Sequence, residues 1–545
     1  MYLDTSILRK NGKVFTRHLL RTSFRDDGTV KHKTIANVSA CSDQEIAALR
    51  LALKHKHNLA AVASVADLQI ALGKRIGAAW VVHVLAERVG IAQALGTDRA
   101  GKLALLQVLA RVIDQGSRLS AVRLAQRHAL CELLGIPKLD EDDLYENLGW
   151  LSAQQAAIEQ RLFAGRFPQT VPTLFLYDVT SAYLEGACNA LAEWGYDRDK
   201  KRGKKQIVVG LLAGPDGLPV AVRVFKGNTP DPQTVRDQVQ MLAERFGVTE
   251  VTLVGDRGML KGPQIDCLPE DFRYLTAITK PQIVKLLHDG VLQYTLFDAQ
   301  VCEVERQGIR YILRRNPVRA EQLAAVREAK EIALRALAAE RTRYLAAHPK
   351  ADVGKAVAKV RAKIAKLKAQ PWLSVITEGR SLTVESAEAA RAEVALLDGC
   401  YVIKSDVPQP HADAQTLHDR YCDLESIERS FRTMKTAHLE MRPVFVQKED
   451  STRGHVFVVM LALLVQRALE KSWAPMNLTV QEGLDELAAI CMQEVQLGTA
   501  SIQSIPTPTP LGAQLLSKAG VVLPSVLPSS KPSVHTKKKL QNERK

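Results

Sequence analysis

Two aspartates close apolar stretches that are typical of buried strands. Asp178 ends the run LFLYD, and Asp256 ends the run VTLVGD. An aspartate at the end of a strand is often only a turn or capping residue. The carboxyl ends of strands are, however, also the places where open α/β sheets form ligand sites. Because the two runs flank a unit of strands and one helix, a shared site and two separate turns both stay open at this point.

Glu428 is a third carboxylate of interest, in the stretch YCDLESIERSFRTMKT that covers 421–436. Tyr421 lies seven residues before it and Lys435 seven after it, and seven residues make two helical turns with a small angular drift. Arg432, four residues after Glu428, falls on the same face. The spacing predicts a helix that presents these four side chains along one stripe, with a solvated charged helix as the competing interpretation.

Three converging carboxylates would favour hard divalent cations. Mg²⁺ and Mn²⁺ take oxygen ligands and keep coordination positions open for phosphate. Two such ions about 4 Å apart can hold the attacking and the leaving oxygen of an in-line phosphoryl transfer. With a basic surface around it, a site of this kind would cut or join a nucleic-acid backbone.

The charge of the chain favours a polyanionic partner. The 545 residues carry a formal net charge of +15, so nucleic acid is the first candidate and an acidic membrane surface the second. Segment 531–545 has six Lys or Arg and one Glu, so it supplies +5 and leaves +10 for the rest. Lys355–Lys368 and this tail could contact phosphates or could simply aid solubility. The run RDKKRGKK offers the strongest candidate DNA contacts, namely Arg198, Lys200, Lys201, Arg202, Lys204 and Lys205.

Cysteine usage and hydropathy bear on the compartment. The eight cysteines form no CxxC pair and no zinc-like cluster with histidine, which favours reduced thiols over a disulfide framework in so long a chain. The N-terminal residues have no apolar core of signal-peptide length. The longest apolar run, Val456–Val465, is too short to span a bilayer. We therefore expect a soluble cytoplasmic protein without a membrane partner, associated with the nucleoid when bound to DNA.

Strands and one helix must position the carboxylates. The runs LFLYDV, QIVVGLLA, PVAVRVFK, VTLVGD and RYLTAIT are predicted strands, and a helix that starts near Thr229 separates the third from the fourth. This order predicts an α/β fold. Composition divides the chain into six parts. An extended, hairpin-forming segment (1–56) is followed by a helical region (57–171), in which a possible helix-turn-helix could bind DNA ends. The sheet is predicted in two parts, 172–280 and 399–500, the second of which includes the Glu428 helix; a largely helical insertion outside the sheet (281–398) separates them, and a basic, disordered tail (501–545) ends the chain.

The ordered motifs resemble those of a known family. YDVTSAYLE, GLPVAVRVFKGNTPD, VGDRGM, YCDLESIERSFRTMK and RPVF are similar, in this order, to motifs of the DDE transposases of bacterial insertion sequences. The helix stretch resembles that family's Tyr-x2-Arg-x3-Glu-x6-Lys signature. The resemblance covers most of 172–470, and 1–170 is similar to the same group with looser motifs. It implies a ribonuclease-H-like mixed sheet with flanking helices, interrupted by an insertion ahead of the catalytic helix.

The resemblance also implies a role for each matching residue. Asp178, Asp256 and Glu428 would be the catalytic residues and the ligands of two Mg²⁺ or Mn²⁺ ions. Tyr421 and Lys435 would contact DNA near the cut end.

The signature is broken at one position. Leu424 stands where the family has an arginine, which removes one phosphate contact, although Arg429 or Arg432 could supply the charge from nearby. Glu425 is the rival third carboxylate, but it lacks partners seven residues away, so Glu428 is preferred.

The implied activity is DNA transposition. Metal-activated water would attack a phosphodiester at the end of the element and free a 3′-hydroxyl, which would then attack target DNA. The implied partners are double-stranded DNA of the element ends and of the target, bound by a homodimer. A ribonuclease-H-like nuclease without strand transfer and an inactive, DNA-binding transposase descendant are the alternatives. An aspartate-nucleophile phosphatase is disfavoured, because Thr180 stands where its Asp-x-Asp motif needs a second aspartate.

Overall fold

The computed structural model describes residues 1–10, 13–57, 68–186, 188–196, 198–248, 250–260, 262–266, 268–269, 271–436, 438–497, 500–527 and 532–537. The chain divides into two compact units. The larger unit comprises Leu85–Ala121, Asp140–Ala468 and Thr536–Lys545, and the smaller unit comprises Met1–Val84, Val122–Leu139 and Leu469–His535.

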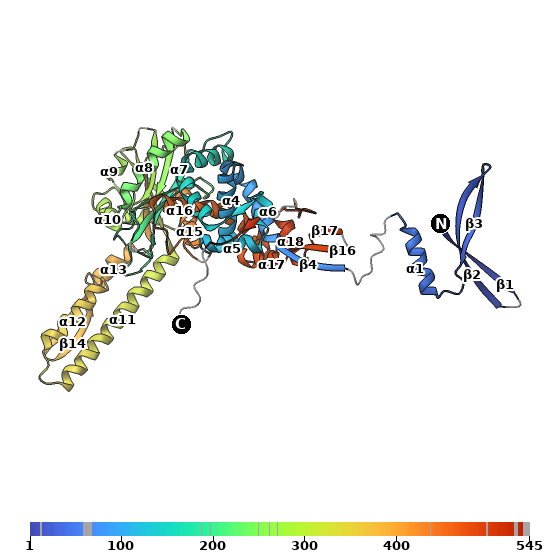
Figure 1. Cartoon of the computed structure of the whole chain (residues 1–545). Helices are drawn as coiled ribbons and strands as arrows, with labels where there is room; N and C mark the ends of the chain where they lie inside the picture. Colours follow the sequence, from blue (N-terminus) through green and yellow to red (C-terminus); the bar gives the residue numbers. More distant parts are fainter. Residues whose placement is uncertain are drawn as a thin grey trace. The chain divides into compact units, whose positions relative to one another are not determined.

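An eight-stranded mixed sheet forms the centre of the larger unit (Figure 1). Its order is β11-β12-β15-β10-β9-β6-β7-β8. β6, β7 and β8 form an antiparallel meander, β9 runs parallel to β6 and to β10, and β15, β12 and β11 continue the sheet antiparallel. The bounds are β6 Leu174–Tyr183, β7 Gln206–Ala213, β8 Pro219–Lys226, β9 Val251–Gly255, β10 Phe272–Ala277, β11 Cys302–Arg306, β12 Ile309–Arg315 and β15 Cys400–Ser405.

The five strands β8-β7-β6-β9-β10 have the order and directions of a ribonuclease-H-like core. All residues of β7 are buried, which explains its uninterrupted apolar run. Phe163 of α7 and Val235 of α8 share a hydrophobic core with Phe175 and Tyr177 of β6. The predicted fold class, a ribonuclease-H-like α/β sheet with flanking helices, is confirmed. The helices between Gly77 and His288 are α2 Gly77–Arg88, α3 Ile91–Leu95, α4 Arg99–Ile113, α5 Arg118–Arg127, α6 Leu130–Leu134, α7 Glu141–Arg166, α8 Asp231–Phe246, α9 Gly262–Ile265 and α10 Lys280–His288. After β15 follow α14 Ala414–Cys422, α15 Leu424–Lys435 and α16 Glu449–Trp473.

β8 is an edge strand whose outward backbone groups are bound by side chains. The Val222 N–H donates to Glu159 Oε1 at 3.2 Å, and the Val222 carbonyl accepts from Gln155 Nε2 at 2.7 Å. The Val224 carbonyl accepts from Arg453 Nη1 at 2.8 Å. Side chains of α7 and α16 thus occupy positions where a further strand would make its hydrogen bonds.

Two strands of the sheet come from 281–398, which we expected to lie outside it. β12 pairs antiparallel with β15, and β11 pairs with β12. Ile312 and Leu313 of β12 are fully buried. Strands that extend an existing edge satisfy their backbone groups and bury apolar side chains at once, so the prediction was wrong for 302–315.

The rest of the insertion is a small subdomain with a hydrophobic core of its own. Leu334 and Val360 are fully buried in that core, and the two long helices lie beside each other (Figure 1). Its elements are α11 Pro317–Ala347, α12 Val353–Lys366, β13 Leu373–Glu378, β14 Ser381–Ser386 and α13 Glu388–Leu396, and the 3-10 helix Tyr294–Leu296 precedes it.

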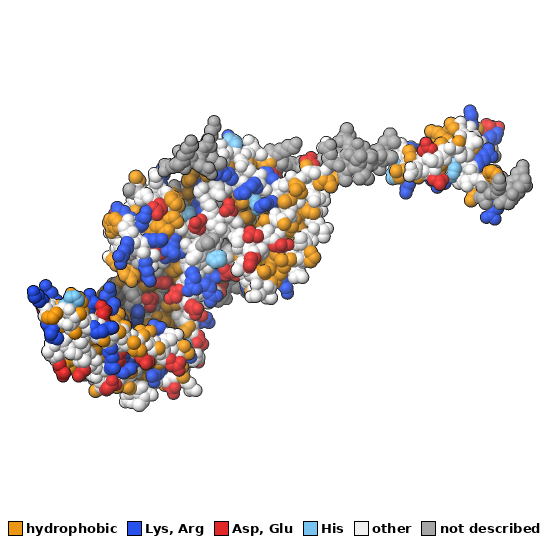
Figure 2. Space-filling model, turned by 90° about the horizontal axis from the view of Figure 1, so that it is seen from below, with side chains coloured by type: hydrophobic (Ala, Val, Ile, Leu, Met, Phe, Trp, Pro, Cys, Tyr) orange, Lys and Arg blue, Asp and Glu red, His pale blue; other side chains and the backbone are white. Residues whose placement is uncertain are grey.

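One side of α12 carries exposed lysines, the α12 lysine face. Its members follow one another at steps of three or four residues and therefore share a face: Lys355, Lys359, Lys363 and Lys366. None of the four pairs with an acidic side chain among the described residues. Figure 2 shows Lys and Arg side chains over much of the subdomain surface, interspersed with Asp and Glu.

α16 is the one helix of the described residues that is long and apolar enough to cross a membrane. Of its most apolar 18 residues, 83% are buried inside the protein, and every residue of the run Val456–Val465 is buried. Burial on all sides is typical of a core helix, which explains its nearly uniform hydrophobicity.

The smaller unit begins with an antiparallel three-stranded sheet. β2 and β3 are joined through Asp27 and Gly28, whose φ angles of 47° and 76° suit a tight hairpin turn. The predicted hairpin is confirmed. The bounds are β1 Tyr2–Lys10, β2 Lys13–Asp26, β3 Thr29–Asn37 and α1 Asp43–Lys54, and a second sheet joins β4 Leu68–Arg75, β16 Cys491–Leu497 and β17 Ala500–Ser504.

Part of the expected disordered tail, 501–545, has regular structure. Thr509 Oγ1 caps α18 by accepting from the Gly512 N–H at 3.0 Å, and Leu515 of this helix is fully buried. The prediction was therefore wrong for this helix, whereas 538–545 lie outside the described residues. The remaining bounds are α17 Val480–Ala488, α18 Pro510–Lys518, the 3-10 helix Ala474–Met476, and β18 Ser533–Val534, which pairs with β5 Lys138–Leu139.

Candidate active site

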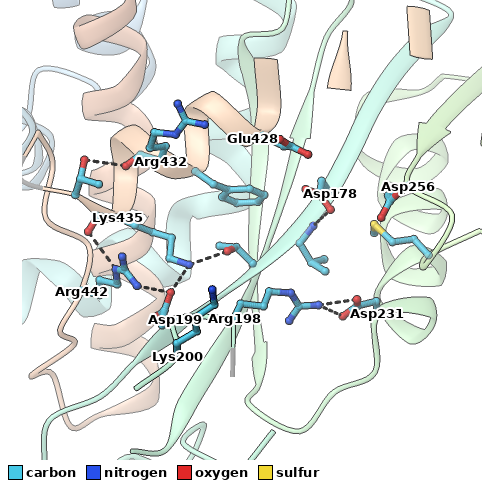
Figure 3. Close-up of a pocket in the computed structure, with 15 residues that line it drawn as sticks. Asp178, Arg198, Asp199, Lys200, Asp231, Asp256, Glu428, Arg432, Lys435 and Arg442 are labelled. Atoms are coloured by element: carbon cyan, nitrogen blue, oxygen red, sulfur yellow. Dashed lines mark hydrogen bonds and ion pairs between the residues drawn. The ribbon is translucent and has the colours of Figure 1, made fainter. Parts of the chain in front are cut away.

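Asp178, Asp256 and Glu428 line one cavity of about 610 Å³ (Figure 3). β6 carries Asp178, Asp256 follows directly after β9, and α15 carries Glu428. β6 and β9 are adjacent parallel strands, and α15 packs against β6. Three segments far apart in the sequence therefore bring the predicted carboxylates to one place.

Asp178 lies inside its strand rather than at its end. β6 continues to Tyr183, and its pairing with β7 runs through Asp178, which faces Leu211. The residues after Asp178 include Thr180 and a tyrosine, both favourable in strands, so the apolar run marked only the first half of β6. Asp256, in contrast, directly follows its strand as expected.

The stretch 421–436 forms two helices rather than one. α14 ends before Asp423 and α15 begins after it, although Asp423 itself keeps helical φ and ψ angles of −60° and −17°. Tyr421 therefore belongs to α14, whereas Glu428 and Lys435 belong to α15. The predicted single stripe is wrong in this respect.

The same three carboxylates also line a second hollow, of about 380 Å³. Tyr421 lies there, together with Leu424 and the rival carboxylate Glu425. The remaining residues lining this hollow are Asn316, Tyr401 and Cys422, so none of its lining residues is basic. The first cavity, in contrast, has five basic lining residues, Arg198, Lys200, Arg432, Lys435 and Arg442. The carboxylates thus border one basic cavity and one hollow without cations.

Negative charge is concentrated at the carboxylates. The pKa of Asp178 is raised to about 7, mainly by burial and also by the nearby charges of Asp256 and Glu428. A hydrogen bond of 2.8 Å from the Val179 N–H opposes this increase. A carboxyl group that loses solvation beside two like charges is relieved by a bound cation.

The donor types fit a hard divalent cation, since all three are carboxylate oxygens beside open cavity space. Among the described residues, no group of three His, Cys, Asp or Glu side chains is gathered tightly enough to hold an ion as it stands. The structure thus shows a shared cavity and coupled charges, and the predicted metal ligation by Asp178, Asp256 and Glu428 stays a prediction.

The basic run 198–205 contributes two of its six predicted contacts to the cavity. Arg198 and Lys200 line it, and Arg198 also pairs with Asp231 at 2.5 Å. Lys204 pairs with Glu185 at 2.5 Å. The four that do not line the cavity are Lys201, Arg202, Lys204 and Lys205. Arg432 and Lys435 line it as expected.

Sequence reasoning missed Arg442 and Asp199, which also line the cavity. Lys435 Nζ lies 2.5 Å from Asp199 Oδ1, and Arg442 pairs with the same oxygen (Figure 3). Both positions carried a signal. Arg442 opens the motif RPVF, and Asp199 is the single carboxylate within RDKKRGKK.

Comparison with known protein families gives matches for an N-terminal segment and for the segment that carries the cavity. Residues 3–64 match the model of the IS1634 family transposase N-terminal domain. Among solved structures, the chain is similar to a piggyBac transposase synaptic complex with hairpin DNA, at 7% identity, with a TM-score of 0.36 over 71% of this chain and 69% of that one. No curated protein matches. Residues 169–465, more than half of the chain, match the model of the transposase DDE domain, and the chain belongs to this transposase family.

Proposed function

We propose that this transposase binds the ends of an insertion sequence, cleaves them by metal-dependent phosphodiester hydrolysis, and joins the freed 3′-hydroxyl ends to target DNA. One observation carries the proposal: Asp178, Asp256 and Glu428 line a single cavity whose wall contains five basic residues. Carboxylates suit the metal, and the cations suit the DNA backbone. Both requirements of the reaction thus meet at one place.

Asp178, Asp256 and Glu428 would hold two Mg²⁺ or Mn²⁺ ions. When bound, such ions activate water and stabilise the charge that develops at the scissile phosphate. The carboxylates come from two neighbouring strands and one packed helix, so their backbone positions are fixed before DNA arrives. This preorganisation lowers the cost of assembling the reacting groups.

The cations of the cavity would bind and orient the DNA strand. Lys435 and Arg442 each pair with Asp199, and Arg432 is exposed one helical turn after Glu428. Their contacts would hold phosphates near the carboxylates without reading base sequence. Tyr421 would meet DNA from the second hollow.

Joining two element ends requires two active sites, so we propose a homodimer on DNA. Two narrower activities would use the same residues: DNA cutting without strand transfer, and DNA binding without catalysis. The presence of all three carboxylates in one cavity favours a catalytic protein over an inactive descendant.

The test is an end-cleavage and strand-transfer assay with the full-length protein and duplex DNA that carries the element's terminal repeats. With Mg²⁺, the wild type should yield 3′-hydroxyl ends and then joined products with plasmid DNA. Glu428→Gln should abolish both products, while Glu425→Gln, one helical turn away on α15, should retain them. Cleavage without joined products would reduce the function to a nuclease, and full activity of Glu428→Gln would remove Glu428 from the site.

A further inference from the structure

The connection between β6 and β7 places one carboxylate between two cations at the cavity wall (Figure 3). Asp199 Oδ1 lies 2.5 Å from Lys435 Nζ, and Arg442 pairs with the same oxygen. Lys435 Nζ also donates to Thr180 Oγ1 at 2.9 Å. Thr180 follows Asp178 by two residues on β6, so the ammonium group is held beside the strand of the first carboxylate.

The three charged groups are shielded from solvent. The side chain of Asp199 is 2% exposed, that of Lys435 11% and that of Arg442 25%. The Tyr183 N–H donates to the second carboxylate oxygen of Asp199 at 3.3 Å. Because a buried charge without a partner is costly, this arrangement is fixed far more firmly than an exposed ion pair.

Asp199 also balances a local excess of positive charge. Burial lowers the pKa of Lys435, and the neighbouring Arg442 and Arg198 lower it further, whereas Asp199 raises it. Without the carboxylate, two partly buried cations would repel each other at the same place. With it, the group keeps one net positive charge and a defined geometry.

We propose that Asp199 is a positioning residue that holds Lys435 and Arg442 as a paired phosphate clamp on the wall of the active-site cavity. The inference rests on the proposed function, because the phosphate belongs to the DNA strand to be cut. Asp199 touches no reacting atom, and it acts through the two cations, which line the same cavity as the three carboxylates. Two cations fixed side by side match the oxygens of one phosphate group.

A double-mutant cycle in the full-length protein tests this role. Asp199→Asn keeps the shape of the side chain and removes its charge, and Lys435→Gln removes one arm of the clamp. Each should slow single-turnover cleavage of element-end DNA by about 100-fold, the cost of a misplaced contact. The double variant should be no more than about twofold slower than the slower single variant, because both changes break the same unit.

Two controls separate positioning from general loosening of the loop. Glu185→Gln removes the exposed ion pair with Lys204 in the same connection, which does not involve Asp199, and should leave the cleavage rate within about twofold of wild type. Asp199→Glu restores the charge and should recover part of the lost rate. Wild-type cleavage by Asp199→Asn, or losses that multiply in the double variant, would overturn the proposal.

The same cycle can be measured on DNA affinity, which needs no catalysis. Lys435→Gln should weaken binding about tenfold in the wild-type background and less than about twofold beside Asp199→Asn. If the wild type binds DNA but does not cut it, the proposed catalytic function is wrong. The role of Asp199 can then still be tested by the affinity measurements alone. A full Lys435→Gln effect in the Asp199→Asn background would overturn the role of Asp199 by itself.

Discussion

The active-site cavity and the insertion subdomain are both rich in charge, but they hold it in different ways. In the cavity, Lys435 and Arg442 converge on one buried carboxylate. On α12, the lysine face is exposed and makes no ion pair among the described residues. The first arrangement fixes the position of each charge, whereas the second offers charge without a fixed position.

This difference has consequences for binding. Fixed, partly buried charges act at short range and depend weakly on salt, because little solvent or counterion screens them. Exposed lysines act through the release of counterions from DNA, so their contribution falls steeply as salt rises. We expect the cavity to govern catalysis and the α12 lysine face to govern general affinity.

The largest expected effect concerns the carboxylates. Asp178→Asn should lower Mg²⁺-dependent end cleavage by about 1000-fold or more, since it removes a proposed ligand of the metal that would stabilise the transition state. DNA binding should persist. Gel-based single-turnover cleavage and fluorescence anisotropy measure the two properties separately, and loss of both together would contradict the assignment.

The same variant should not lose stability. In the folded protein the pKa of Asp178 is raised to about 7, so its ionised form disfavours folding. This cost is absent at pH below the unfolded pKa and grows as pH rises toward about 7. In metal-free buffer, the melting temperature of Asp178→Asn should therefore exceed that of wild type at pH 8, with a smaller difference at pH 5.

The next effect tests whether the insertion subdomain has an independent core. Leu334→Ala should cost about 2–5 kcal/mol locally, because Leu334 is fully buried there. Hydrogen exchange should accelerate in α11 and α12 but not in β7. Ile332→Ala, on the same helix but 62% exposed, is the matched control and should leave exchange unchanged. Equal acceleration in β7 would show that subdomain and sheet open together.

A smaller effect is expected from the α12 lysine face. Replacing Lys355, Lys359, Lys363 and Lys366 by Gln should weaken DNA binding about tenfold at low salt and lower the slope of log affinity against log salt by up to about four. The loss should be equal for element ends and unrelated DNA. The corresponding Lys→Arg variant keeps the charge and should bind like wild type. A loss confined to element ends would contradict a general backbone role.

The smallest effect concerns the departure from the family signature. Leu424→Arg introduces a cation into the hollow that has none among its lining residues. It should tighten binding to element ends by a few-fold, about the value of one exposed phosphate contact. Leu424→Gln supplies a polar side chain without charge as the comparison. If the arginine variant binds no better than the glutamine variant, a cation at position 424 makes no contact with DNA in this protein.

Local patterns drew attention to Asp178, Asp256 and Glu428, because apolar runs and helical spacing are visible within about fifteen residues of each. Only the family resemblance joined the three into one predicted site. The clamp was not predictable in this way. Asp199 and Lys435 are far apart in the sequence, and only the connection between β6 and β7 brings them together. The same reason explains why β12 was misplaced, since its pairing with β15 joins strands on either side of a whole subdomain.

The capped edge at β8 limits how two copies of this chain can assemble. Glu159, Gln155 and Arg453 already bind three of the backbone groups that an incoming strand would need, the N–H and carbonyl of Val222 and the carbonyl of Val224. A second molecule therefore cannot continue the sheet through Val222 and Val224 without first displacing these side chains. In the homodimer on DNA that we propose, the two copies would therefore have to meet through another surface, and the occupied edge also guards the free protein against edge-to-edge aggregation.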